Sequence, residues 1–132
     1  MRPLLTILLI TLITVSCTKS QEDQSPQGTY TGTFQRITGG MGDTVHVSVS
    51  LVGNVFSGIG GRDYYPSICS GTFSLNGEQA DFKNSCFFTA NFDWSLILNG
   101  KYTFNSKDDS LVITRDYNGI FRDEYRLAKV RN

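Results

Sequence analysis

Apolar and polar residues alternate along most of this chain after residue 28. In the segment 44–51, Val45, Val47, Val49 and Leu51 fall on one side, and Thr, His and Ser residues fall on the other. A period of two is that of a β-strand with one buried face, whereas a helix repeats every 3.6 residues. The pattern therefore predicts a half-buried strand in this segment and argues against an amphipathic helix.

Further segments follow the same rule, and Gly, Asn and Asp residues separate them. They are 29–37, 55–59, 71–75, 80–83, 92–98, 101–105, 111–115 and 120–130. The pairs Gly53-Asn54, Asn76-Gly77 and Asn99-Gly100 predict tight turns, so the strands that they join should be antiparallel neighbours. About eight to nine short strands predict an all-β fold without lid helices, either a small antiparallel up-and-down β-barrel or a sandwich.

The first 16 residues predict a signal peptide. An apolar run over 4–15, interrupted only by threonines, follows Arg2 and is shorter than the roughly 20 residues that span a bilayer. It ends at Ser16-Cys17 and resembles a bacterial lipobox, although Thr14 stands where Leu is usual. We therefore expect Cys17 to carry palmitate-type acyl chains, and more than one chain gives a stable anchor. An ordinary signal peptide with a chance cysteine is the alternative.

The segment 17–27 predicts a lipidated cysteine and a flexible tether, because residues 18–27 are polar apart from one proline. Residue 18 is Thr and not the Asp that signals inner-membrane retention in many Gram-negative lipoproteins. Lys19, Glu22 and Asp23 resemble the acidic export tags of surface lipoproteins in the Bacteroidota. We expect an outer-membrane lipoprotein of the cell envelope, periplasmic or surface-exposed, with its folded domain over residues 28–132.

Cys69 and Cys86 remain as an even pair in an oxidising compartment, which predicts a disulfide. Strand register supports the same pair. If residues 76–79 form the connection, Phe73 faces Phe82 and Cys69 faces Cys86. A two-residue turn at Asn76-Gly77 would instead place Cys69 opposite Asn84.

Composition argues against several functions. Twelve Lys and Arg residues balance twelve Asp and Glu residues, so a nucleic-acid partner has no electrostatic support. The single histidine, His46, excludes a His-based metal cluster, and no spacing brings two of the carboxylates Asp81, Asp93, Asp116 and Glu124 to one site. We expect no catalytic residues, no metal, no cofactor and a monomer.

The segment Gly28-Thr29-Tyr30-Thr31-Gly32-Thr33-Phe34 resembles the first strand of lipocalin-like barrels. The resemblance places Tyr30 at the position of the Trp that closes a lipocalin barrel floor, with Arg126 or Arg131 as its partner. The segments 69–73 and 92–98 are similar to small lipocalin-like lipoproteins of the Bacteroidota. A second lipocalin motif and a C-terminal helix are not evident.

Positions of one parity along the strands predict the interior. Bulky side chains fill a small barrel, so we expect a solid core with a shallow pocket at one mouth. The residues expected inside are Tyr30, Phe34, Val45, Val47, Val49, Leu51, Phe73, Leu75, Phe82, Trp94, Leu96, Leu98, Tyr102, Phe104, Leu111, Ile113, Phe121, Tyr125 and Leu127.

The 60–67 connection combines aromatic and charged residues, and Arg62, Tyr64 and Tyr65 are the expected ligand contacts at the mouth. The expected function is a non-catalytic, lipocalin-like module for a small apolar or amphipathic ligand. The alternative is a structural lipoprotein that docks an envelope protein or a surface glycan. An open pocket of a few hundred Å³ favours the ligand, and a patch of exposed aromatics favours the partner or glycan.

Lipidation of Cys17 is testable by substitution. Cys17→Ala removes the thiol that would carry the lipid, so the variant should leave the membrane fraction. Fractionation followed by immunoblotting measures this. A variant that is processed normally and still sediments with the outer membrane contradicts the assignment.

Overall fold

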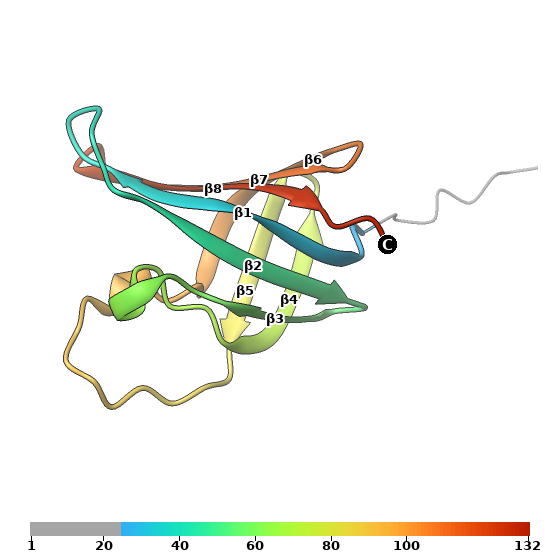
Figure 1. Cartoon of the computed structure of the whole chain (residues 1–132), viewed down its shortest axis with the longest axis horizontal. Helices are drawn as coiled ribbons and strands as arrows, with labels where there is room; N and C mark the ends of the chain where they lie inside the picture. Colours follow the sequence, from blue (N-terminus) through green and yellow to red (C-terminus); the bar gives the residue numbers. More distant parts are fainter. Residues whose placement is uncertain (1–24) are drawn as a thin grey trace, which may run out of the picture.

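The alternating segments form a closed, up-and-down β-barrel in the computed structural model, which describes residues 25–132 (Figure 1). Every strand pairs antiparallel with the next along the chain, and the last pairs with the first, which confirms the predicted fold. The expected signal peptide, Cys17 and most of the tether lie outside the described residues. The strands are β1 (Gly28–Ile37), β2 (Thr44–Val52), β3 (Val55–Ile59), β4 (Ser70–Asn76), β5 (Gln79–Asn84), β6 (Gly100–Lys107), β7 (Ser110–Tyr117) and β8 (Phe121–Lys129).

The helical structure in residues 25–132 consists of two short 3₁₀ turns, η1 (Arg62–Tyr64) and η2 (Trp94–Leu96). Each has three residues, so neither is a lid helix, as expected from the sequence. Within this part of the chain, no helix has the length and apolar character needed to cross a membrane.

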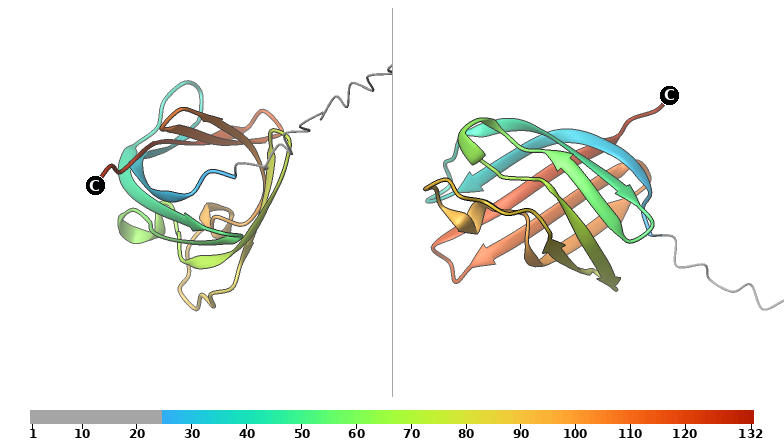
Figure 2. Two further views of the ribbon diagram at one scale, coloured as in Figure 1. Left: turned by 90° about the vertical axis from the view of Figure 1, so that its right-hand side faces the viewer. Right: turned by 90° about the horizontal axis from the view of Figure 1, so that it is seen from below.

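The two ends of the barrel differ in how the strands are joined. At the end where Ser25 and the C-terminus lie, here called the turn end, two-residue turns connect β2 to β3, β4 to β5 and β6 to β7. At the opposite end, here called the loop end, the connections are longer and cover residues 38–43, 60–69, 85–99 and 118–120. Figure 2 (left) looks into the barrel from the turn end.

The sequence prediction was wrong for residues 92–98, which form no strand. Asp93 caps η2 by accepting a hydrogen bond from the Ser95 amide at 3.0 Å, and the chain around Ile97 forms a single isolated bridge to Ser67. For the same reason Asn99-Gly100 is not a hairpin turn, and Gly100 starts β6 beside β5. The Gly53-Asn54 turn is as predicted, but the β4–β5 turn is Gly77-Glu78 and not Asn76-Gly77.

Most of the predicted interior is buried. Packed rings fill the middle of the barrel, including Phe34 against Tyr125 at 4.7 Å and Phe56 against Phe82 at 5.3 Å between centroids. Trp94 is a misassignment, since 58% of it is exposed. Buried hydrophobic residues that the parity rule missed are Phe56, Ile68, Ala80 and Ile97.

The disulfide between Cys69 and Cys86 is present, with a Cα–Cα distance of 6.3 Å. The register is the one that predicted it, because Leu75 pairs with Ala80, Phe73 with Phe82 and Gly71 with Asn84. The bond ties the start of β4 to the connection after β5 at the loop end. It therefore fixes the first residues of the long 85–99 connection against the barrel.

Loss of this disulfide should destabilise the barrel. Replacing Cys69 and Cys86 together by Ala opens a loop with a sequence separation of 17 residues, which should lower the free energy of unfolding by about 3 kcal/mol. Urea unfolding followed by circular dichroism measures the change. Ready alkylation of both thiols in unreduced protein taken from the envelope would contradict the bond.

Candidate ligand-binding site

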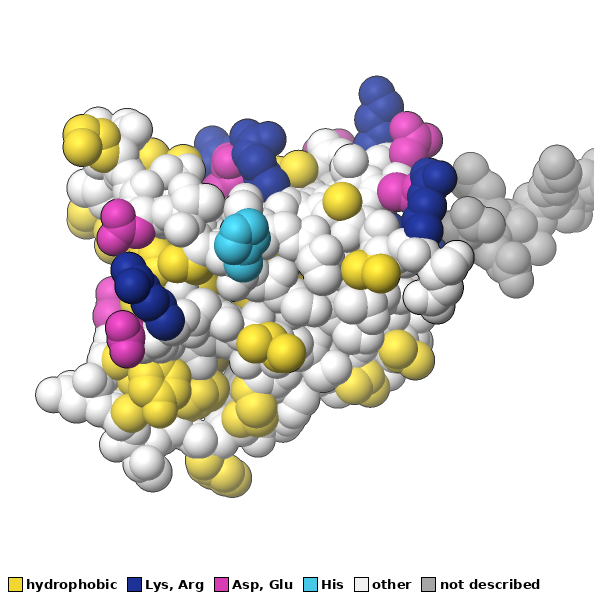
Figure 3. All heavy atoms as spheres, viewed as in Figure 1, with side chains coloured by type: hydrophobic (Ala, Val, Ile, Leu, Met, Phe, Trp, Pro, Cys, Tyr) yellow, Lys and Arg dark blue, Asp and Glu magenta, His cyan; other side chains and the backbone are white. Residues whose placement is uncertain are grey.

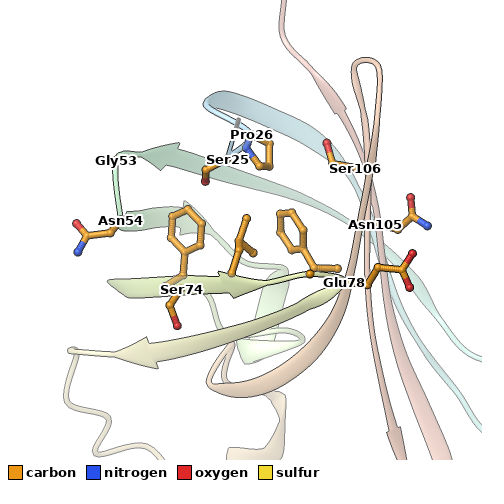
Figure 4. Close-up of a pocket in the computed structure, with 12 residues that line it drawn as sticks. Ser25, Pro26, Gly53, Asn54, Ser74, Glu78, Asn105 and Ser106 are labelled. Atoms are coloured by element: carbon orange, nitrogen blue, oxygen red, sulfur yellow. The ribbon is translucent and has the colours of Figure 1, made fainter. Parts of the chain in front are cut away.

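A pocket of about 530 Å³ opens at the turn end of the barrel. Phe73 and Leu75 of β4 and Phe104 of β6 are its apolar residues from the barrel interior. Polar residues of the β2–β3 and β4–β5 turns and of β6 complete the lining, together with Ser25 and Pro26. Figure 4 shows Ser25 and Pro26 across the space from Ser74, with Asn54 at one rim and Glu78 at another.

The pocket exists because two-residue turns are too short to fold over this end of the barrel. The inward row of β4 ends at Leu75, which is half buried, and no strand connection within residues 25–132 covers it. At the loop end, longer connections place Ile68, Leu96 and Leu98 over the core. The free interior volume is therefore at the turn end.

The chain that leads into β1 forms one wall of this pocket and is fixed there by Gln27. The Gln27 side chain accepts a hydrogen bond from the Gly53 amide at 2.6 Å and donates to the Gly53 carbonyl at 3.2 Å. This two-point contact joins the N-terminal segment to the β2–β3 turn. Ser25 and Pro26 are thereby held beside the mouth.

Arg62, Tyr64 and Tyr65 lie together in and after η1, but at the loop end and therefore at the end opposite the pocket. Their side chains have different surroundings. Arg62 and Tyr64 are exposed, whereas Tyr65 is half buried. Their role in ligand binding stays a prediction.

Tyr65 is a packing residue of the barrel. Its ring meets Phe34 edge-on at 5.3 Å, its hydroxyl accepts a hydrogen bond from the Arg36 amide at 3.1 Å, and it donates to the Asp43 carbonyl at 3.4 Å. Tyr64 faces outward and stacks on Phe92 at 4.5 Å. The two tyrosines therefore belong to two different surfaces.

Arg36 forms a polar cluster that sequence reasoning missed. Its guanidinium makes a bidentate pair with buried Asp123, at 2.6 and 2.7 Å. It also donates to Asp93 at 2.8 Å, to the Ser95 hydroxyl at 3.0 Å and to the Ser95 carbonyl at 3.3 Å. These bonds use all five N–H donors of the side chain, so none is left for a ligand.

The cluster keeps its groups in fixed charge states. Burial alone would lower the pKa of Arg36, but the hydrogen bonds and charge of Asp123, with the charge of Asp93, raise it overall. Hydrogen bonds from Ser95, and then the charge of Arg36, hold the pKa of Asp93 below its ordinary value. Burial raises the pKa of the neighbouring Tyr117 and Tyr125 hydroxyls. The cluster is therefore an ion-pair network among neutral tyrosines, which is suited to holding structure.

A sequence signal for this cluster did exist. Arg36 and Asp123 occupy inward-facing positions in the alternation of β1 and β8, next to Phe34 and Tyr125 in each row. An inward-facing charge must be paired when it is buried. Only apolar residues entered the predicted interior, so this pair was overlooked.

Tyr30 is buried at the turn end, but the arginines expected beside it have other partners. Arg126 pairs with Glu124 on the outer face of β8, and Arg131 pairs with Asp109. Asp109 contributes, after burial, to the raised pKa of Tyr30. Tyr30 is therefore a core residue at the turn end, with the Asp109–Arg131 pair nearby, and its expected contact with an arginine is not formed among the described residues.

Within residues 25–132, no three His, Cys, Asp or Glu side chains are arranged to hold a metal ion. Comparison of the chain with protein-family models, curated proteins and solved structures gives no match. The site is therefore characterised by its geometry.

Removal of the Arg36 side-chain charge should strongly destabilise the barrel. Arg36→Met leaves Asp123 buried without its partner, which should cost about 3–5 kcal/mol of unfolding free energy. The matched control is the double variant Arg36→Met with Asp123→Leu, which removes both charges and should recover most of the loss. Urea unfolding followed by circular dichroism measures both. Equal losses in the single and double variants would contradict a buried charge as the cause.

Proposed function

We propose that this protein is a non-catalytic binding module of the cell envelope that holds a small apolar or amphipathic ligand in the turn-end pocket. The pocket is the observation that supports it. Its volume of about 530 Å³ lies within the roughly 300–1,000 Å³ of typical small-molecule sites. Apolar residues from the barrel interior below a polar rim suit a ligand with an apolar body and a polar end.

The rim favours a ligand whose polar end is uncharged. Glu78 is the one charged residue among those that line the pocket, and the other polar residues are Ser and Asn. A carboxylate or phosphate on the ligand would meet hydroxyls, amides and a like charge. Neutral hydrogen-bonding groups would meet matching donors and acceptors.

The pocket lies beside the chain that would lead to the anchor. Ser25 and Pro26 line it, and seven residues lie between Cys17 and Ser25, so the two Cα atoms are at most about 28 Å apart. With Cys17 lipidated in the outer membrane, this span would limit how far the barrel can move from that membrane. A ligand that partitions into lipid would then be concentrated near the protein.

The described part of the chain gives catalysis little support. Arg36 has no free donor, the tyrosines around it are held in their neutral form, and His46 stands exposed on the outer wall of β2. The alternative function, docking of an envelope protein or a surface glycan, leaves the pocket without a role.

Filling the pocket should weaken binding. Leu75→Trp places a large ring at the half-buried pocket position, so affinity for the neutral probe N-phenyl-1-naphthylamine should fall roughly tenfold or more, equivalent to at least about 1.4 kcal/mol. Ile59→Trp is the matched control, because Ile59 is exposed on the barrel wall. Probe fluorescence titration measures the affinity.

The wild-type protein should also bind the neutral probe more tightly than the anionic probe anilinonaphthalene sulfonate. Native mass spectrometry of protein from its own envelope would identify a retained ligand. Probe binding that is equal in wild type and Leu75→Trp would place the ligand elsewhere and contradict the proposed function.

A further inference from the structure

The long connection between β5 and η2 carries an exposed aromatic surface at the loop end. Here the name aromatic loop is used for residues 85–92, which swing away from the barrel wall (Figures 1 and 2). Phe87 is 99% exposed, and Phe88 and Phe92 are half buried. Hydrophobic side chains gather over this region in Figure 3.

The rings are arranged as one continuous set. Tyr64 of η1 stacks on Phe92 with 14° between the planes, and Phe88 meets Phe92 edge-on at 5.7 Å. Trp94 follows at 6.3 Å from Phe92, and its indole N–H donates to the Ala90 carbonyl at 3.3 Å. Ring stacking and this hydrogen bond hold the aromatic side chains in defined positions.

Both stems of the aromatic loop are fixed to the barrel. The disulfide to Cys69 holds Cys86 on one side, and the Ser85 amide donates to the Ser70 carbonyl at 2.9 Å. On the other side, Arg36 binds Asp93 and Ser95. The exposed aromatic residues between these stems therefore project from a fixed base. Phe87 is exposed, so its side chain does not stabilise the barrel by packing.

The aromatic loop itself carries no charge, and the nearest acidic residues, Asp63 and Asp93, stand beside its base. The eight residues from Ser85 to Phe92 include no charged side chain, and a charge is what a bilayer resists most. The exposed cation Arg62 stands in η1 next to the exposed Asp63 and forms no ion pair with any described residue. It could meet lipid phosphate while the rings enter below it.

The kinds of aromatic residue also match the depth profile of a bilayer interface. Phenylalanine prefers the apolar side, whereas Tyr and Trp prefer the headgroup level. Here Phe87 is in the projecting part, and Tyr64 and Trp94 lie at its base. A projecting surface of this kind differs from the concave sites that hold small ligands.

We propose that the aromatic loop docks on a phospholipid bilayer, with Phe87 and Phe88 entering the interface and Arg62 meeting headgroup phosphate. Interfacial segments enter only about 5–10 Å, so the loop backbone stays within reach of water. This contact lies at the end opposite the pocket and does not depend on ligand binding there.

Trp94 is the only tryptophan of the chain and reports on the contact directly. The full-length protein is reconstituted into vesicles of phosphatidylethanolamine and phosphatidylglycerol that carry brominated acyl chains. Docking should quench Trp94 fluorescence and shield it from iodide in the buffer. Replacing phosphatidylglycerol by phosphatidylcholine should weaken the quenching in wild type but have little effect in Arg62→Gln.

Phe87→Ser should remove most of the quenching, because Phe87 is fully exposed and its loss leaves the packed rings intact. Ile59→Ser, on the exposed wall of β3, is the matched control and should quench like wild type. A wild-type Trp94 that iodide reaches and brominated lipid does not would overturn the proposal and assign the surface to a protein or glycan. Equal quenching in wild type and Phe87→Ser would also overturn it.

Discussion

The barrel closes where β1 meets β8, and the buried pair of Arg36 and Asp123 lies on that seam. These two residues are direct partners in the β1–β8 register, and their side chains form the bidentate ion pair. Gly32, further along the same seam, allows close approach, because a Cβ there would lie 2.0 Å from the Arg126 carbonyl oxygen. Closure leaves no free strand edge for aggregation, so all eight strands depend on this contact.

Closure also explains which parts of the structure could be predicted from the sequence. The two-residue period gave the strands, and the register of β4 and β5 gave the Cys69–Cys86 bond. Residues 92–98 show the same alternation, yet they form no strand. The eight strands of the barrel pair with one another and leave no edge, and Asp93 bends the chain into η2 instead. The alternation of apolar and polar residues shows which side chains of a segment could face the core. Whether the segment becomes a strand depends on a second strand with a free edge to which it can hydrogen-bond.

The candidate sites were harder to predict than the fold, because they depend on the lengths of the connections. Aromatic content drew attention to Tyr64 and Tyr65, but it could not show that Tyr65 packs on Phe34. Nothing in the residues of the turn-end pocket marks them as a site, since Phe73, Leu75 and Phe104 read as core. They line an open pocket because short turns at their end leave them uncovered.

The inward-facing rows of three strands change character along the barrel axis. On β1, β7 and β8 they pass from Tyr30, Leu111 and Leu127 at the turn end to Arg36, Arg115 and Asp123 near the loop end. The charged end is closed by ion pairs and by Arg36 lying 4.1 Å from the centre of the Phe121 ring. An apolar ligand would have to break that network to enter there, whereas at the turn end it meets only apolar interior. The charged residues near the loop end hold the 85–99 connection in place. They would also restrict an apolar ligand to the mouth at the turn end.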